Sequence, residues 1–372
     1  MIYLDNAATT LPKPVAVERA VCRAMQSMAS PGRGAHPPAM RAAETLFQCR
    51  SAAAELFNMP EPERVVFTMN ATHALNIAIR SKARRGTRVL ISGFEHNSVT
   101  RPLADIGTDI TVAGRKLFDR EDTLNAFKRE ISRAELVVCT HVSNVFGYIL
   151  PIYDIAALCR KHGVPLIVDA SQSAGVLEVD FQKLGAAFVA MPGHKALFGP
   201  QGTGILLCGE EGVPLMQGGS GSDSIPQLMP EYLPDRLEAG THNTTGVAGL
   251  LAGINFVREK GTENIRKHER ALLEHMANEL ESEKTELFAA DASVQSGVLS
   301  LRVKGRGCED IADGLSQRGV CVRSGLHCAP TAHRSAGTLD TGTIRFSFSP
   351  FVTEAQVRSA CGIMRDLIFK ES

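Results

Sequence analysis

Short apolar, β-branched runs alternate with helical stretches between residues 65 and 208, and this alternation constrains the fold more than any other feature. The runs predict strands, and the stretches between them carry apolar residues at spacings of three and four, as amphipathic helices do. Strands separated by helices favour an α/β fold, with a mostly parallel sheet and helices on both faces. We expect strands at residues 65–67, 88–92, 136–140, 165–169, 187–191 and 204–208, and helices at 71–83, 98–106, 122–132 and 152–161.

The pattern changes after about residue 245, where long helical stretches replace the regular alternation. A chain of 372 residues can form one large domain and a smaller one. We predict a large domain of residues 15–250, and a smaller α+β domain of residues 1–14 and 251–372. The smaller domain is expected to contain helices at 247–259, 263–281, 308–317 and 353–369, and strands at 297–303, 319–323 and 343–347.

The composition limits the classes of partner and the expected location. Lys+Arg and Asp+Glu balance at 40 each, so no net charge favours nucleic acid or an anionic membrane as a partner. No apolar run is long enough to span a bilayer, and the first residues lack the pattern of a secretion signal. Nine cysteines without a Cys-x-x-Cys pair argue against a disulfide framework and favour a reducing cytoplasm.

Lys195 lies in a glycine-rich segment directly after a predicted strand. A lysine in a desolvated or cationic environment loses its proton more easily and can form a Schiff base with an aldehyde. Asp169 ends an earlier apolar strand, where its carboxylate could pair with a pyridinium nitrogen. The alternative for Asp169 is a helix N-cap.

Two further polar segments follow predicted strands. His96 comes after strand 88–92, and its ring could stack on a planar cofactor or serve a structural purpose. Ala71 and Thr72 begin a helix after strand 65–67, and a helix N-terminus is a natural phosphate site, although simple N-capping is the alternative. Together these features predict a ligand site beyond the carboxyl ends of the strands.

The order and spacing of these motifs resemble the class V, fold-type I pyridoxal-phosphate enzymes, and within them the cysteine desulfurases and selenocysteine lyases. The resemblance covers nearly the whole chain. The motifs that carry it are Asp-Asn-Ala-Ala-Thr-Thr at 5–10, Glu-His-Asn-Ser at 95–98, His-Val-Ser-Asn at 141–144, Asp-Ala-Ser-Gln at 169–172, Gly-His-Lys at 193–195, Glu-Ala-Gly-Thr at 238–241 and Arg-Ser-Gly-Leu-His-Cys-Ala at 323–329.

The resemblance implies a mostly parallel seven-stranded sheet, pyridoxal 5'-phosphate as cofactor, and a homodimer. Lys195 would hold the cofactor and move the substrate proton, while Asp169 would pair with the ring nitrogen and His96 would stack on the ring. Arg345 would bind the substrate carboxylate, for which a planar guanidinium is well suited. The remaining implied contacts are Gln172 and Asn144 near the ring hydroxyl or the substrate, Ala71, Thr72 and His194 at the phosphate, and Thr241 at the phosphate of the neighbouring subunit.

Cys328 lies in a polar, glycine-containing loop, unlike the cysteines in apolar runs. An exposed thiol near cationic groups has a larger thiolate fraction and attacks sulfur well, although an ordinary exposed cysteine is the alternative. The resemblance, which is nearest to the SufS-like branch, implies that Cys328 receives sulfur and that His327 assists at the substrate. A metal site of His327, Cys328 and His333 would lack a second pair of ligands at a usual spacing, so we expect no metal.

The expected reaction converts L-cysteine to L-alanine and leaves a persulfide on Cys328 for a sulfur acceptor. A selenocysteine lyase, another class V aminotransferase and a non-catalytic scaffold remain alternatives. The acceptor is not named by the sequence, and iron-sulfur cluster assembly, tRNA thiolation and a dedicated pathway all stay open. Pro192 departs from the family pattern, in which a serine or threonine helps to hold the phosphate, and it has neither a hydroxyl nor an N–H.

Overall fold

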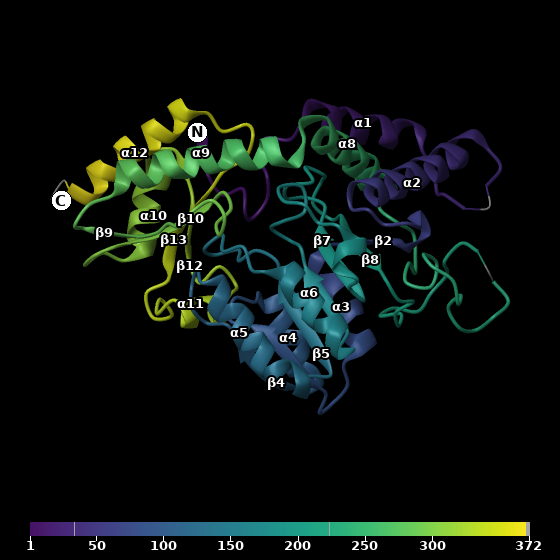
Figure 1. Cartoon of the computed structure of the whole chain (residues 1–372). Helices are drawn as coiled ribbons and strands as arrows, with labels where there is room; N and C mark the ends of the chain where they lie inside the picture. Colours follow the sequence, from purple (N-terminus) through teal and green to yellow (C-terminus); the bar gives the residue numbers. More distant parts are fainter. Residues whose placement is uncertain (33, 223, 370–372) are drawn as a thin grey trace.

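A seven-stranded sheet forms the centre of the computed structural model, which describes residues 1–32, 34–222 and 224–369 (Figure 1). The strand order is β2-β8-β7-β6-β5-β3-β4, and β8 runs antiparallel to both of its neighbours while the other pairs are parallel. The predicted mostly parallel seven-stranded sheet is thereby confirmed. Its strands are β2 (Val65–Thr68), β3 (Arg88–Ser92), β4 (Asp109–Ala113), β5 (Leu136–Thr140), β6 (Leu166–Asp169), β7 (Phe188–Pro192) and β8 (Gly204–Cys208).

Successive residues of a strand point to opposite faces of the sheet. Both faces of this sheet therefore carry apolar side chains, and helices cover both. In β5, Val137 and Cys139 join the apolar cluster beneath α5 and α6, whereas Leu136 and Val138 join the cluster beneath α3 and α4. The four helices predicted between the strands are therefore confirmed. The helical elements of this region are η1 (Pro62–Arg64), α3 (Ala71–Lys82), α4 (Asn97–Ile106), α5 (Arg120–Glu130), η2 (Ile131–Arg133), α6 (Ile152–His162) and α7 (Phe181–Leu184).

Several elements form where the alternation predicts none. Strand β4 lies at the edge of the sheet and is mostly not buried, so its sequence lacks the continuous apolar run of the central strands. Helices α1 (Val15–Ser27) and α2 (Pro37–Leu56) pack against α8 (Thr244–Lys260) at one end of the molecule (Figure 1). Residues distant in the sequence thus contribute to burying the apolar side chains of α1 and α2.

A second, antiparallel sheet of order β12-β13-β10-β9 lies at the other end of the molecule. Helix α9 runs from α8 to this sheet, and α12 packs beside α9 (Figure 1). Apolar residues of both helices and of the sheet form one core cluster. The elements are α9 (Thr262–Leu280), β9 (Thr285–Phe288), β10 (Val298–Val303), α10 (Cys308–Gln317), β12 (Arg323–Gly325), α11 (Pro330–Ser335), β13 (Thr343–Ser347) and α12 (Glu354–Phe369).

The N-terminal segment joins this second region. Strand β1 (Ile2–Tyr3) pairs in parallel with β11 (Val320–Cys321), and Asp5 forms a bridge with Ser347. The prediction of a single strand at 319–323 is therefore wrong. The chain forms β11, stops pairing with β1 at Val322, and continues as β12, which pairs with β13.

The predicted division of the chain into two domains at residue 250 stays a prediction, and that position falls inside α8. None of the helices within the described residues combines the length and apolarity that crossing a bilayer requires.

Candidate active site

A cavity of about 180 Å³ lies beyond the carboxyl ends of β5, β6 and β7, at the edge of the sheet where α/β folds bind ligands. Its walls come from segments that follow five different strands, so it forms only when the sheet is complete. Among the residues predicted for the site, those that line the cavity together are Ala71, Thr72, His96, Asn144, Asp169, Gln172, His194 and Lys195.

The amine of Lys195 is less basic than that of an ordinary lysine. Burial lowers the pKa of Lys195 to about 8, the positive charge of Arg345 acts in the same direction, and the carboxylate of Asp169 opposes both. The side chain keeps partial access to the cavity. A much larger fraction of this amine than of an ordinary lysine is therefore neutral and nucleophilic near neutral pH.

The loop that carries Lys195 is held by the N-terminal segment. The hydroxyl of Thr10 donates to the backbone oxygens of His194 and Lys195, at 3.1 and 3.0 Å. The ammonium of Lys13 donates to the same His194 oxygen at 2.7 Å. The sequence analysis assigned no role to Thr10 or Lys13, although Thr10 ends a motif that carries the family resemblance.

Gly175 allows a second segment to approach the same loop. Its φ of +91° is in the left-handed region, and a Cβ at this position would lie 2.2 Å from the backbone oxygen of Ala196. Only glycine fits this contact without a shift of the backbone.

Asp169 and His96 both face the cavity, and each side chain makes a local hydrogen bond. The carboxylate of Asp169 is buried and accepts from the backbone N–H of Ser171 at 2.9 Å, but no helix begins there, so the helix N-cap considered for Asp169 is wrong. His96 is the N-cap of α4, where its Nδ1 accepts from the N–H of Ser98 at 3.0 Å. Burial lowers the pKa of His96, so the ring is neutral. These hydrogen bonds fix the orientation of both side chains toward the cavity.

Glu95 supports His96 from beneath the cavity, and sequence reasoning gave it no role. Its fully buried carboxyl group bonds the hydroxyl of Ser92 and the N–H of Thr140, the latter at 2.9 Å. Burial raises the pKa of Glu95 to about 8. Through these hydrogen bonds the carboxyl group of Glu95 connects the ends of β3 and β5 next to His96.

The N-terminus of α3 presents backbone donors to the cavity. The side chain of Asn70 accepts from the N–H of His73 at 2.9 Å, and its backbone oxygen accepts from Ala74. The first N–H groups of a helix have no intrahelical partner, so those of Ala71 and Thr72 are available to an anion. These donors, the amine of Lys195 and the carboxylate of Asp169 fit the phosphate, aldehyde and ring nitrogen of pyridoxal phosphate.

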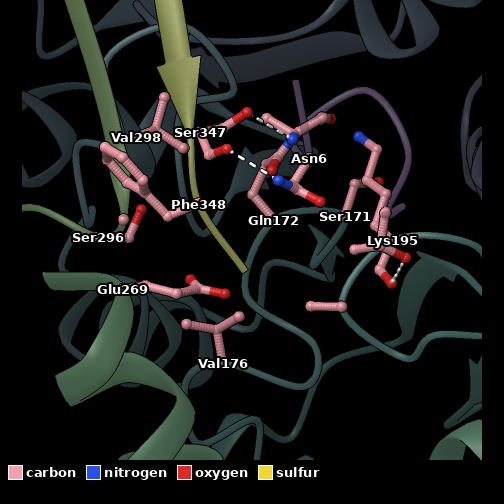
Figure 2. A pocket seen from close by; sticks show the side chains of 14 residues that line it. Asn6, Ser171, Gln172, Val176, Lys195, Glu269, Ser296, Val298, Ser347 and Phe348 are labelled. Carbon is pink, nitrogen blue, oxygen red and sulfur yellow. Dashed lines mark hydrogen bonds between the residues drawn. The ribbon is translucent and has the colours of Figure 1, made fainter. Parts of the chain in front are cut away.

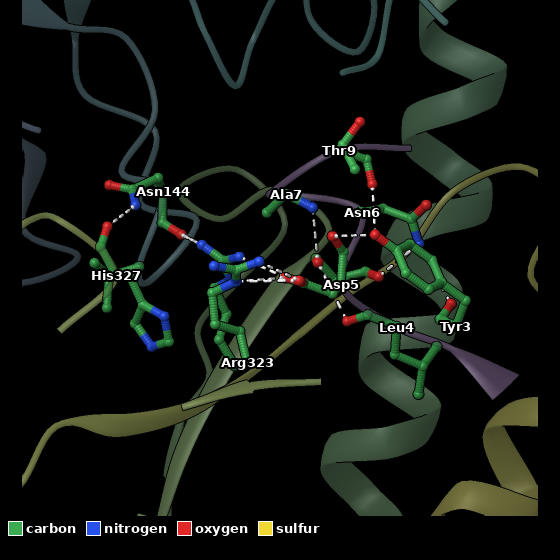
Figure 3. Close-up of polar contacts among 12 residues, drawn as sticks. Tyr3, Leu4, Asp5, Asn6, Ala7, Thr9, Asn144, Arg323 and His327 are labelled. Atoms are coloured by element: carbon green, nitrogen blue, oxygen red, sulfur yellow. Dashed lines mark hydrogen bonds and ion pairs between the residues drawn. The ribbon is translucent and has the colours of Figure 1, made fainter. Parts of the chain in front are cut away.

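Arg345 is buried and forms an ionic cluster with Asp5 and Arg323, of which Figure 3 labels the last two. Its Nη2 donates to Asp5 at 2.8 Å, and its Nη1 donates to the backbone oxygen of Asn144 at 3.0 Å. Arg323 pairs with the same Asp5 carboxylate at 2.9 Å. The Nε of Arg345 is buried and has no partner among the described residues. The carboxylate of Asp5 thus occupies part of the Arg345 guanidinium, which was predicted to bind the carboxylate of the substrate.

Cys328 is exposed on a loop that is fastened to the cavity from two sides. Its backbone oxygen accepts a hydrogen bond at 2.8 Å from the N–H of Asn97, the residue that follows His96 in the chain. The backbone oxygen of His327 accepts from the side-chain amide of Asn144 at 2.8 Å. His327 and Cys328 have φ values of +48° and +55°, and consecutive left-handed residues other than glycine typically occur at functional sites.

The ring of His327 points away from the main cavity. Its Nε2 lies 3.1 Å from the hydroxyl of Thr343, and the ring stacks on His333 at 5.7 Å. Burial lowers the pKa of His327 to about 2, so the ring is neutral at physiological pH. Within the described residues, no group of three or more His, Cys, Asp or Glu side chains is placed to hold a metal ion. The predicted contact of His327 with substrate stays a prediction.

Thr241 is the predicted residue that lies apart from the others. It lines a separate groove together with Met69, His73, Glu238 and His242. Glu238 forms a buried bidentate pair with Arg50, which fixes the start of this segment. Within one chain, Thr241 therefore does not reach the cavity that contains Lys195.

A second, smaller cavity of about 30 Å³ lies on the other side of Gln172 and Lys195 (Figure 2). Glu269 of α9 lines this cavity, and its carboxyl group makes no hydrogen bond to the described residues. Burial raises the pKa of Glu269 well above its ordinary value, so the cavity favours the protonated form. Its position in an ordinary amphipathic helix gave no sequence signal.

The model of the Aminotransferase class-V family matches residues 2–359, and the chain belongs to this family. It is 33% identical to a probable cysteine desulfurase of Methanothermobacter thermautotrophicus, over 96% of this chain and 92% of that protein. A cysteine desulfurase of Cronobacter sakazakii is 31% identical over 98% of this chain and 93% of its own length. An apo structure of a cysteine desulfurase from Thermococcus onnurineus NA1 superposes with a TM-score of 0.90, at 30% identity, over 99% of this chain and 94% of that one.

Proposed function

We propose that the chain is a pyridoxal-phosphate-dependent cysteine desulfurase, which converts L-cysteine to L-alanine and retains the sulfur on Cys328. The observation that carries the proposal is the placement of the exposed Cys328 thiol beside a cavity that contains Lys195. The names of the full-length relatives support the same activity.

Eight residues of the cavity would hold the cofactor. The N–H groups of Ala71 and Thr72 would bind the phosphate, and the neutral ring of His96 would stack on the cofactor. Asp169 would stabilise a protonated ring nitrogen, and Lys195 would hold the aldehyde carbon. Pyridoxal phosphate supplies a ring that withdraws electrons from the α-carbon of a bound amino acid. His194, Gln172 and Asn144 complete the proposed set.

Lys195 and Cys328 would perform the proton and sulfur transfers. The neutral amine of Lys195 accepts the proton from the α-carbon of the substrate, because its pKa of about 8 leaves it able to act as a base. The thiolate of Cys328 attacks the substrate sulfur, and a new S–S bond forms as the Cβ–S bond breaks. The electron pair of that bond remains on the β-carbon, which takes up a proton from solvent, and the amine of Lys195 returns its proton to the α-carbon, so that L-alanine is released. Arg345 would orient the substrate carboxylate through its unpaired Nε.

Alanine and sulfide should be measured with cysteine as substrate in the presence of a reductant. Cys328→Ser should bind the cofactor normally and lose sulfide release, whereas Cys22→Ser, which alters an exposed cysteine of α1, should retain it. Lys195→Ala should lose the absorbance of the protein-bound cofactor. Full activity of Cys328→Ser with cysteine would contradict the proposal, and activity with selenocysteine alone would favour a selenocysteine lyase.

We further propose a homodimer in which a second copy covers the groove that contains Thr241. Exposed apolar side chains surround this groove, and an apolar patch of this kind typically marks an interface. Met69 and Met216, which line the groove, are 54% and 44% exposed. Met216→Asp should shift the mass measured by light scattering from dimer to monomer. A monomeric wild type would refute this assembly.

We place the enzyme in the reducing cytoplasm because all nine cysteines are unpaired thiols. Its sulfur would pass to an acceptor, with iron-sulfur cluster assembly as one destination.

A further inference from the structure

Cys328 lines an open groove of about 430 Å³ on the solvent side of the main cavity. The groove shares Thr72, His96 and Ser98 with that cavity, so Cys328 lies between the cavity and solvent. A sulfur atom bound to Cys328 can therefore be reached from the groove without entry into the cavity. The rest of the groove is lined mainly by residues of α3 and α4.

The groove carries one excess positive charge. Arg80 is paired with Asp105 at 2.6 Å, which neutralises both. Arg101 is exposed, and its guanidinium makes no hydrogen bond or ion pair with the residues that the structure describes. The N-terminus of α4 lies at the same place, and its dipole adds to the positive potential.

Most of the ten residues that line the groove carry a polar group, although carbon atoms make up the larger part of its surface. Of the ten residues that line the groove, Pro102 is the one with an apolar side chain, whereas protein-docking surfaces have apolar centres. The volume falls in the range of small-molecule sites. Amide and hydroxyl groups of Asn76, Asn97 and Thr72 supply hydrogen bonds for carboxylate or amide groups.

From these features we propose that the groove binds a small anionic thiol, which accepts the sulfur from Cys328. The inference rests on the proposed desulfurase function and names the class of its acceptor. The carboxylate of the thiol binds Arg101, and its thiolate attacks the terminal sulfur of the persulfide. A new S–S bond forms to the acceptor, the S–S bond to Cys328 breaks, and its electron pair leaves on the Cys328 thiolate. The terminal sulfur keeps its proton, and no oxidant or reductant is consumed.

The test measures the rate at which thiols of different charge discharge the persulfide of the holoenzyme. Enzyme is first loaded with one equivalent of cysteine. The alanine formed in this single turnover is measured before any other thiol is added. Mercaptosuccinate, 2-mercaptoethanol and cysteamine are then added separately, and the loss of persulfide is followed. Comparing each variant with wild type for the same thiol cancels the intrinsic reactivity of that thiol.

Arg101→Gln should slow discharge by mercaptosuccinate about three- to fivefold, the range of an exposed ion pair, and leave 2-mercaptoethanol within about twofold of wild type. Arg101→Lys should restore most of the rate. Arg129→Gln removes an equal charge from the exposed face of α5 and should change none of the three rates.

Three outcomes would overturn the inference: an equal effect of Arg101→Gln on all three thiols, no effect on mercaptosuccinate, or a persulfide that no small thiol discharges. The last result would assign the groove to a protein acceptor. If no alanine forms in the single turnover, the proposed desulfurase function fails instead. Alanine formation therefore separates the two failures.

Discussion

The titration of Lys195 offers the most direct check of the electrostatics of the site. Its pKa of about 8, compared with an ordinary 10.5, corresponds to roughly 3 kcal/mol of preference for the neutral amine. At pH 7 about 9% of the amine is neutral, which is on the order of 300 times the neutral fraction of an ordinary lysine. The reactivity of Lys195 should therefore rise with pH and level off above about pH 8.

The measurement uses protein stripped of its cofactor and trace amounts of acetic anhydride at a series of pH values. Mass spectrometry of the peptide that contains Lys195 gives the labelled fraction and hence the midpoint. Asp169→Asn should lower the midpoint, because the carboxylate favours the charged amine, and Arg345→Gln should raise it. A wild-type midpoint near 10.5, or two variants that move the midpoint in the same direction, would refute the reasoning.

Three further outcomes are expected. Asp5→Asn leaves Arg345 as an uncompensated buried charge and should cost about 3 kcal/mol of unfolding free energy in urea; an unchanged midpoint would contradict the role of this pair. In wild type, Glu269 binds its proton more readily in the folded state than in the unfolded state. The free energy of unfolding therefore falls as pH rises above the unfolded pKa of Glu269, by up to about 1.4 kcal/mol per pH unit until its raised folded pKa is reached. The gap in melting temperature between Glu269→Gln and wild type should therefore widen from pH 5 to pH 7, and a constant gap would be inconsistent with a protonated carboxyl. Pro192→Ser should tighten cofactor binding about tenfold in a spectroscopic titration, through one added hydrogen bond to the phosphate. Pro192→Ala is its control, and equal affinities would exclude the added bond.

The central part of the fold and much of the cavity follow from local sequence patterns. Asp169, His96 and Lys195 each follow an apolar run, and the carboxyl ends of parallel strands meet at one edge of a sheet. Residues in these positions are brought together by the sheet itself. Strand positions and cavity residues could therefore be predicted without knowledge of any long-range contact.

The contacts that the sequence did not predict depend on segments far apart in the chain. The pairing of Asp5 with Arg345 joins residues 340 positions apart, and no local pattern specifies it. Glu269 reads as an ordinary helical glutamate, and packing against other segments, among them the one that contains Gly297, buries it. The switch from β11 to β12 occurs within three residues, which is too short for a periodic signal.

The ionic cluster of Asp5 also has a consequence for synthesis on the ribosome. Asp5 emerges among the first residues, but its partners Arg323 and Arg345 are translated more than 300 positions later. At typical elongation rates this delay is roughly 20 to 70 seconds, during which the central sheet can already fold. For this time the carboxylate of Asp5 lacks both cationic partners, although Thr10 and Lys13 can already bind the loop of Lys195. The nascent chain therefore acquires its sheet early and its ionic cluster last.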